Sequence, residues 1–158
     1  MCVVKIKPHI VSPINVVPKE GEDLFRLIFD MRFINKHLRV PKFKMDGLNN
    51  LVSVVRPGDW LFTLDDVAGY HHVPVMEEFR KYLGFEWDGV YYEWCVLSFG
   101  VAYAPWLFTK IKRQLVRFWR SKGIRCVSFV DDVLFACSSL SEALKLRDQV
   151  LRDMMKCG

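Results

Sequence analysis

The sequence lacks the features that are typical of secreted proteins, zinc-binding domains and membrane-spanning proteins. Its five cysteines are well separated and include no C-x-x-C pair, which argues against a structural zinc site. The opening "MCVVKIKPHI" lacks the long apolar stretch and small-residue cleavage site of a secretory signal. No segment approaches the roughly 18 apolar residues needed to span a bilayer. We therefore expect reduced thiols and an intracellular protein, cytoplasmic or nuclear, with no membrane partner.

Repeats, low-complexity linkers and a strong excess of one charge are also missing. The 158 residues, 51% apolar and 14% aromatic, are enough for an ordinary domain with a packed core. Lys and Arg outnumber Asp and Glu by 23 to 18, which gives a formal net charge of +5. This mild basic excess suits a nucleic-acid partner, although many proteins without such a partner share it.

Turn residues and hydrophobic periodicity predict short strands in the first half of the chain. Residues 14–35 contain two extended segments around a polar turn at residues 19–23. Residues 44–55 fit a short helix capped by Asp46, and residues 59–65 fit a short apolar strand.

Two hairpins and two helices are predicted in the second half. Asp88 and Gly89 supply the two positive-φ positions of a tight turn between aromatic-rich arms. A long basic helix begins near Pro105 and ends before Gly123, and a second hairpin and a final helix follow. This order predicts an α+β fold in which helices pack on one face of an antiparallel sheet.

The second hairpin, "SFVDDVLF" at residues 128–135, places two adjacent carboxylates inside an apolar run. An ordinary turn with hydrated Asp side chains is the simplest explanation. However, Val130 and Val133 are poor turn neighbours, and adjacent carboxylates near a packed sheet repel each other unless a cation neutralises them. A second acidic pair, Asp65-Asp66, ends the apolar strand, where a helix N-cap is the alternative role. Carboxylates from two strand ends would suit Mg²⁺, and two such ions can promote phosphoryl transfer.

Four segments in order resemble the motifs of reverse transcriptases. "FTLDDVAGYHHVPV" resembles motif A, "LSFGVAYAPWLFTKI" resembles motif B, and "FVDD" resembles motif C, [YF]-x-D-D. Upstream, Arg26, Asp30, Arg32 and Asn35 follow the fingers pattern R-x-x-x-D-x-R-x-x-N. Several phrases, among them "YHHVPV" and "GIRCVSFVDDVLF", resemble retrotransposons of the DIRS type, with gypsy-type elements as near relatives. The resemblance implies a right-hand polymerase with fingers and palm.

The resemblance assigns a catalytic role to three carboxylates. It implies that Asp65, Asp131 and Asp132 hold two Mg²⁺ ions, with Mn²⁺ as the alternative, and that Asp66 adds a backbone carbonyl. Asp66 also departs from the family pattern, because an apolar residue is commoner there.

Other residues would bind the nucleotide and support the fingers. The implied nucleotide-binding residues are Lys19, Arg26, Tyr70, Phe99 and Gly100. Tyr70 would be the steric gate that disfavours a ribose 2′-OH, with ordinary aromatic packing as the alternative role. Asp30, Arg32 and Asn35 would support the fingers and the template, with a structural ion pair as the alternative for the first two. Basic residues between positions 110 and 122 would lie along the template or form a solvated helix face.

The implied function is RNA-directed DNA polymerisation, the addition of dNTPs to a primer 3′-OH on an RNA or DNA template. Residues 1–58 would be a fingers-like segment with an N-terminal extension, and residues 59–158 would be a palm-like segment. Family members continue into a thumb that is absent here, so we expect a piece of a longer polyprotein. A catalytically inactive remnant that keeps the fold and binds nucleic acid is the main alternative. An RNA-templated RNA polymerase is disfavoured by Tyr70.

Overall fold

The computed structural model describes residues 1–21 and 23–157. The chain forms two compact units that interleave along the sequence: Met1–Pro41 with Tyr70–Leu107, and Lys42–Gly69 with Phe108–Gly158. The assignment of residues 1–58 to fingers and 59–158 to palm remains a prediction, because compactness does not by itself identify those parts.

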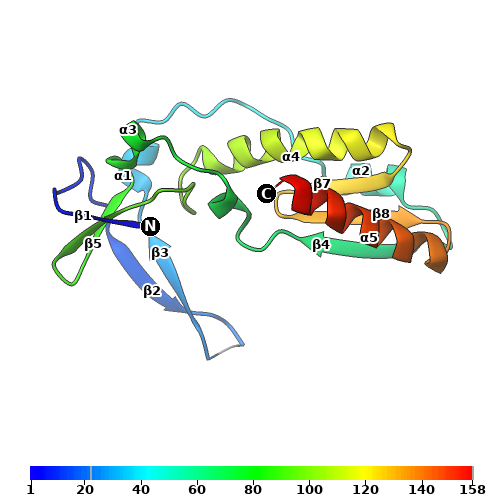
Figure 1. The fold of residues 1–158 in the computed structure, drawn as a ribbon, viewed down its shortest axis with the longest axis horizontal. Helices are drawn as coiled ribbons and strands as arrows, with labels where there is room; N and C mark the ends of the chain where they lie inside the picture. The colour runs from blue at the N-terminus through cyan, green and yellow to red at the C-terminus, as the bar shows by residue number, and fades with distance from the viewer. Residues whose placement is uncertain (22, 158) are drawn as a thin grey trace. The chain divides into compact units, whose positions relative to one another are not determined.

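The first unit is built from short antiparallel strands. Its strands are β1 (Cys2–Val4), β2 (Ile14–Pro18), β3 (Phe25–Phe29), β5 (Gly84–Trp87) and β6 (Val90–Glu93), and its short helices are α1 (Arg32–Asn35) and α3 (Glu77–Arg80). β2 and β3 form a separate hairpin, and the other strands form a sheet in the order β1-β6-β5 (Figure 1). The predicted hairpin turn is confirmed, with φ of 50° at Asp88 and 73° at Gly89. The two arms predicted around residues 19–23 are confirmed as strands, although residue 22 of that turn lies outside the described residues.

β1 was not foreseen, and it brings a cysteine pair together. β1 runs antiparallel to β6, and Cys2 forms a disulfide with Cys95 just beyond β6. The expectation that all the cysteines are reduced thiols is therefore wrong for this pair. The sequence carries no local signal for this disulfide, because the two cysteines lie 93 positions apart.

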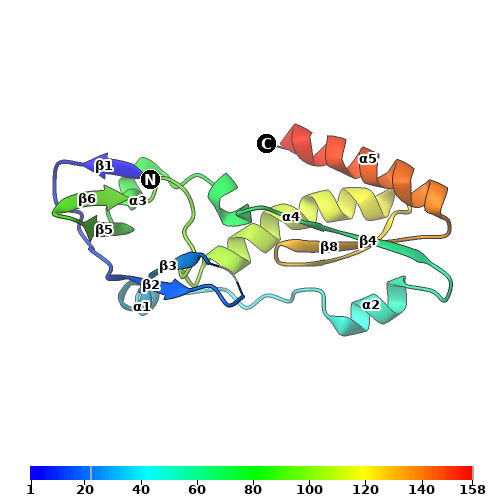
Figure 2. The ribbon, with the colours of Figure 1, turned by 90° about the horizontal axis from the view of Figure 1, so that it is seen from below.

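The second unit contains the predicted antiparallel sheet, and its two long helices pack on one face of that sheet. Its elements are α2 (Leu48–Val54), β4 (Trp60–Asp65), most of α4 (Ala104–Ser121), β7 (Arg125–Phe129), β8 (Asp132–Cys137) and α5 (Leu140–Cys157). The 3₁₀ turn η1 (Gly69–His72) and α4 each continue from one unit into the other. The antiparallel order β4-β8-β7 places β8 in the centre of the sheet, and α5 runs beside it (Figures 1 and 2).

The core of the second unit joins both long helices to β8. Trp119 of α4 and Val150 of α5 are fully buried with Phe135 of β8. The Phe135 ring stacks on Phe62 of β4 with 4.9 Å between ring centroids. Because side chains alternate across a strand, the residues of β8 next to these buried ones point to the opposite face of the sheet.

One predicted helix cap is wrong. α2 begins after Gly47, whose N–H donates to Asn50 Oδ1 at 3.0 Å. The Asp46 carboxylate instead accepts from Arg120 Nη2 at 2.5 Å and from the Ser128 N–H at 3.3 Å. Asp46 therefore pairs with Arg120 of α4 and does not cap α2. No helix of the described part of the chain has the length and apolar character needed to cross a membrane.

Candidate active site

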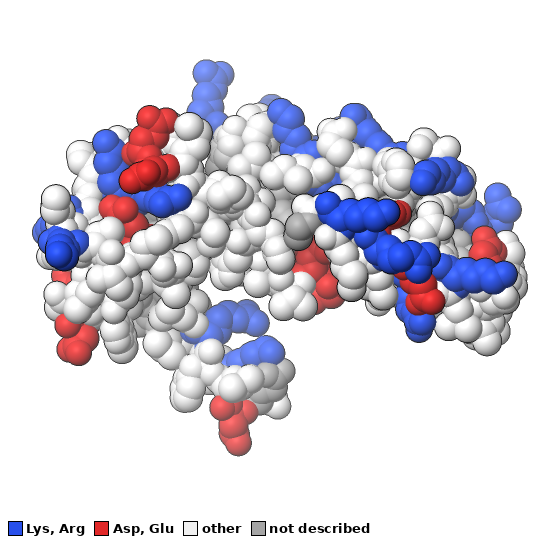
Figure 3. All heavy atoms as spheres, viewed as in Figure 1, with Lys and Arg blue, Asp and Glu red and all other residues white. Residues whose placement is uncertain are grey.

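The end of β4 and the start of β8 carry two carboxylates in direct register. Asp65 is paired with Asp132, and both side chains are exposed. Their neighbours Leu64 and Val133 pack into the core, so alternation places the two carboxylates on the face opposite the core formed with α4 and α5. Directly opposed residues of antiparallel strands lie about 5 Å apart at Cβ, where like charges are destabilising. On the face drawn in Figure 3, acidic side chains gather where β4 ends and β8 begins.

The third carboxylate lies in the two-residue turn between β7 and β8. Because Phe129 pairs with Asp132, the turn residues are Val130 and Asp131, one position earlier than the predicted Asp131-Asp132 tip. Val130 has φ of 48°, an unfavourable conformation for a β-branched residue. Val130 is therefore itself a turn residue, whereas Val133, directly after Asp132, is 1% exposed and packs in the core.

The Asp131 carboxylate lies in a partly buried, acidic environment. Its Oδ1 atom is buried without a hydrogen-bond partner. Burial raises the pKa of its carboxyl group, Lys112 opposes this rise, and the acidic neighbours Asp66, Asp65 and Asp132 add to it. The described side chains therefore bring all four acids of the two motifs into one electrostatic cluster.

Lys112 was not singled out among the basic residues of its helix, and it is the cation of this cluster. The side chain is 7% exposed, and its ammonium lies 2.5 Å from Asp66 Oδ2. It also donates to the carbonyl oxygens of Val130 and Asp131, at 3.0 and 2.6 Å. Because helical spacing places residue 112 near the apolar positions 108 and 115, the periodicity offered a signal of its burial.

Gly69 is a further residue that the sequence did not mark. A Cβ atom there would lie 2.6 Å from Phe108 Cζ and 3.0 Å from Asp131 Oδ1. Glycine therefore leaves the space that the Asp131 carboxylate occupies.

The donor chemistry of the cluster fits a hard divalent cation, but the side chains are not arranged as a ligand shell. Carboxylate oxygens are the preferred ligands of Mg²⁺, and the unpartnered Asp131 Oδ1 needs a partner. Within residues 1–21 and 23–157, no group of three or more His, Cys, Asp or Glu side chains has the geometry to hold a metal. The carboxylate of Asp66 is engaged by Lys112, so its backbone carbonyl is the oxygen left to offer.

Three of the predicted nucleotide-binding residues line one pocket of the first unit. Arg26, Phe99 and Gly100 border a cavity of about 620 Å³ along β3. Gly100 has φ of 88°, and a Cβ atom there would lie 3.2 Å from the Phe29 carbonyl oxygen. Glycine fits both the positive φ and the tight space at this position, whereas the role of Gly100 toward a nucleotide stays a prediction.

Tyr70 and Lys19 lie elsewhere in the same unit. Tyr70 is 7% exposed, with its ring centroid 4.9 Å from that of Phe99. Lys19 follows β2, and its backbone N–H donates to the Leu24 carbonyl at 2.8 Å. Neither residue is part of the lining of the cavity beside Arg26.

Asn35 fastens the loop that carries Gly100. Its amide Nδ2 donates to the Gly100 carbonyl at 2.8 Å, and its Oδ1 accepts from the Ala102 N–H at 2.8 Å. Asp30 and Arg32 form a two-pronged ion pair, with distances of 2.6 to 3.0 Å. Arg32 lowers the pKa of Asp30 to about 2. The structural ion pair, which was the alternative role of Asp30 and Arg32, is thus observed. Asn35 supports the Gly100 loop directly.

Part of the basic surface of α4 is used inside the second unit. Arg113 donates to the Lys44 carbonyl at 2.6 Å, and Arg120 pairs with Asp46. These contacts hold the segment before α2 against the helix. Basic side chains also follow α5 on the face shown in Figure 3. The basic residues of α5 are Lys145, Arg147, Arg152 and Lys156.

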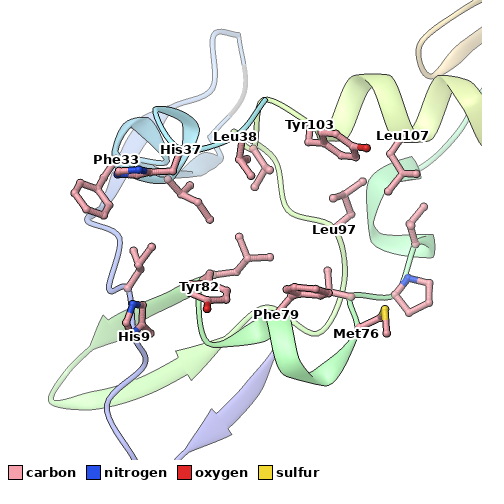
Figure 4. Close-up of a pocket in the computed structure, with 17 residues that line it drawn as sticks. His9, Phe33, His37, Leu38, Met76, Phe79, Tyr82, Leu97, Tyr103 and Leu107 are labelled. Atoms are coloured by element: carbon pink, nitrogen blue, oxygen red, sulfur yellow. The ribbon is translucent and has the colours of Figure 1, made fainter. Parts of the chain in front are cut away.

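A larger apolar pocket has none of the site carboxylates in its lining. It has a volume of about 880 Å³, lies wholly within the first unit, and is lined by side chains such as Phe33, Phe79 and Leu97 (Figure 4). No predicted catalytic or nucleotide-binding residue borders it. Its size therefore does not identify it as the site of chemistry.

Comparison with known proteins agrees with the motif order. Residues 17–158 match the family described as "Reverse transcriptase (RNA-dependent DNA polymerase)". The Pol polyprotein of transposon gypsy from Drosophila melanogaster is 30% identical over 146 residues, which cover 89% of this chain and 14% of that polyprotein. The Gag-Pol polyprotein of walleye dermal sarcoma virus is 29% identical over 138 residues, covering 85% of this chain and 8% of its own length.

Solved structures share the fold. The foamy viral protease-reverse transcriptase in complex with dsDNA superposes with a TM-score of 0.85 at 23% identity. That alignment covers 99% of this chain and 32% of the foamy viral chain. The same enzyme in complex with an RNA/DNA hybrid gives a TM-score of 0.80, again at 23% identity, over 97% of this chain and 20% of that one.

Proposed function

The chain belongs to the reverse transcriptase family, and from this premise we propose that it supplies the fingers and palm of an RNA-directed DNA polymerase. A primer 3′-OH attacks the α-phosphate of a dNTP on an RNA or DNA template, and pyrophosphate leaves. The observation that carries the proposal is the direct pairing of Asp65 with Asp132 beside the Asp131 turn. The foamy viral complexes support a nucleic-acid partner for this chain.

Asp65, Asp131 and Asp132 would hold the divalent metal, with the carbonyl of Asp66 as a further oxygen. Two bound Mg²⁺ ions, or Mn²⁺, would neutralise charge on the attacking and leaving oxygens. The chain's own task is to keep like charges together at one end of the sheet. The ladder between β4 and β8 and the buried ammonium of Lys112 support that task.

The first unit would bind the nucleotide. Arg26 and Lys19 would neutralise phosphate oxygens, because both are cations on the β2–β3 hairpin. Phe99 and Gly100 would shape the pocket wall. Tyr70, fixed by burial, would stop a ribose 2′-OH by steric contact. Asp30, Arg32 and Asn35 would support this region, the last through its bonds to the Gly100 loop.

The parent protein would be a Pol polyprotein acting inside the cell. The curated relatives are polyproteins, and this chain spans about a seventh of the gypsy protein. The clamping of a primer–template duplex would then fall in part to segments beyond these residues.

Primer extension on an RNA template with Mg²⁺ tests the proposal. The assay compares residues 1–158 alone with the same residues joined to a related thumb, each with and without Asp131→Asn. We expect the joined protein to incorporate dNTPs and Asp131→Asn to lower incorporation at least about a hundredfold, because it removes charge from the reacting centre.

Asp88→Asn is the matched control, since it makes the same change in a remote hairpin that tolerates Asn. Incorporation unaffected by Asp131→Asn would falsify the catalytic assignment. No incorporation by the joined protein would favour the inactive remnant.

A further inference from the structure

The ammonium of Lys112 has a complete set of partners in the carboxylate cluster. Its three contacts are Asp66 Oδ2, the Val130 carbonyl and the Asp131 carbonyl, at 2.5, 3.0 and 2.6 Å. A lysine ammonium has three N–H donors, so these partners can use all of them. The residue is 8% exposed, and a charge that deeply placed is tolerated only when paired and hydrogen-bonded.

Two of those three partners belong to the strained turn. Val130 has φ of 48°, which a β-branched residue adopts only when its surroundings impose it. The Asp131 carbonyl accepts a second hydrogen bond, from the Asp66 N–H at 3.1 Å. Asp66 therefore touches the turn through its own backbone and, through Lys112, with its carboxylate.

The other possible role of this ion pair is to fill space beneath the sheet. In a pair that only fills space, the lysine and the carboxylate would need each other as partners, and any nearby polar atoms could accept the remaining hydrogen bonds. Here both remaining donors converge on consecutive carbonyls of one turn, and that turn carries an acid whose Oδ1 has no partner of its own. The contacts thus fix the backbone from which the Asp131 side chain projects.

We propose that Lys112, with Asp66 as its counter-ion, is a positioning residue that holds the Val130–Asp131 turn against the end of β4 and so sets the direction of the Asp131 carboxylate. Asp131 as a catalytic carboxylate rests on the proposed function, whereas the holding of the turn does not. Asp66, unusual for its place in the motif, is explained as the partner that allows a lysine at position 112.

The test separates loss of a charge from loss of the turn contacts. Lys112→Met alone leaves the Asp66 carboxylate without its counter-ion. Lys112→Met with Asp66→Leu removes both charges and leaves an apolar pair. We expect the single variant to be strongly destabilised and the double variant to regain most of its resistance to denaturant. Arg117→Met, on the exposed side of the same helix, is the matched control and should behave as the wild type.

The deciding readout is amide hydrogen exchange in the 158-residue chain without metal or nucleic acid. In the double variant we expect the amide of residue 66 to exchange at least about tenfold faster than in the wild type, while the Phe135 amide in β8 keeps its protection. Equal protection of residue 66 in both proteins would mean that the pair only fills space, and would overturn the proposal.

A second pair of substitutions covers a double variant that fails to fold. Lys112→Gln with Asp66→Asn removes both charges but keeps side-chain N–H donors for the turn carbonyls. Protection of residue 66 in this variant should lie between that of the wild type and that of a Lys112→Ala, Asp66→Asn pair. No difference between these two pairs would also overturn the proposal.

Mn²⁺ binding, followed by paramagnetic relaxation of water protons, links the turn to the carboxylates. We expect the apolar double variant to bind Mn²⁺ about tenfold more weakly than the wild type, and equal affinity would contradict the claim about the Asp131 carboxylate. A wild-type chain that binds no Mn²⁺ would count against the proposed function. The exchange result would still decide whether Lys112 holds the turn.

Discussion

The two units hold their candidate site residues by different means. In the second unit, a buried ammonium at Lys112 offsets several carboxylates and fastens a turn in which Val130 is strained. In the first unit, the neutral amide of Asn35 fastens the Gly100 loop through two backbone groups. Charge pairing therefore holds the site residues in the second unit, and hydrogen bonds to the backbone hold them in the first unit.

The difference bears on what each site tolerates. Buried charges depend strongly on their partners, so losing one partner of Lys112 is expected to cost more than losing either hydrogen bond of Asn35. A neutral amide bonded to exposed backbone groups can be replaced in part by water. Substitutions in the two units can therefore separate electrostatic support from backbone support.

The largest effect is expected in the packing beneath the carboxylates. Phe135→Ala removes a fully buried ring from the strand that begins with Asp132, which should lower the free energy of unfolding by about 3–5 kcal/mol. Chemical denaturation measures this change. Phe129→Ala, at a ring that is 53% exposed on the neighbouring strand, should change the same free energy by no more than about 0.5 kcal/mol. Equal losses would show that the helix-covered face does not hold β8.

Gly100→Ala should come next. The substitution imposes positive φ on alanine and brings Cβ to 3.2 Å from the Phe29 carbonyl, for a cost of about 1–3 kcal/mol. Gly89→Ala is the control, because φ there is 73° but the space around its Cβ is open. Thermal or denaturant unfolding should rank Gly100→Ala above Gly89→Ala, and the reverse order would remove close approach as the reason for glycine.

Asn35→Ala should have a smaller effect, about 1–2 kcal/mol, because two hydrogen bonds are lost while water reaches part of the site. Amide exchange at Ala102, whose N–H bonds Asn35 Oδ1, is the direct measurement. Asn49→Ala on the exposed face of α2 is the control and should leave that amide unchanged. An unchanged Ala102 amide in Asn35→Ala would instead contradict amide support of the loop.

The smallest effect is expected at Asp30. Its pKa of about 2 lies below the ordinary value of 3.8 because of Arg32, so the pair stabilises the fold above pH 4 and loses that contribution as the pH falls toward 2. Both groups are at the surface, so added salt should weaken the effect. Carboxyl NMR titration should give a midpoint near 2, and Arg32→Gln should return it toward 3.8. A midpoint that ignores Arg32→Gln would exclude the ion pair as the cause.

Much of the fold could be predicted because its signals are local. Asp88-Gly89 selects a tight turn wherever it lies, and the helix between Pro105 and Gly123 has its apolar stripe and end signals within one segment. The α+β order and the likeness to retrotransposon reverse transcriptases are confirmed. Local signals failed at Asp46, which was predicted to cap a helix but pairs with Arg120, 74 positions away.

The sequence by itself determined the residue types and their order: acids after two apolar strands, a glycine in the motif B loop, and basic residues along one helix. Only the tertiary structure decided the partners. It paired Asp65 with Asp132, buried Lys112 against Asp66 and the Val130–Asp131 turn, and joined Cys2 to Cys95. The physical reason is that periodicity and turn chemistry act within a few residues, whereas register, burial and charge pairing join residues that only folding brings together.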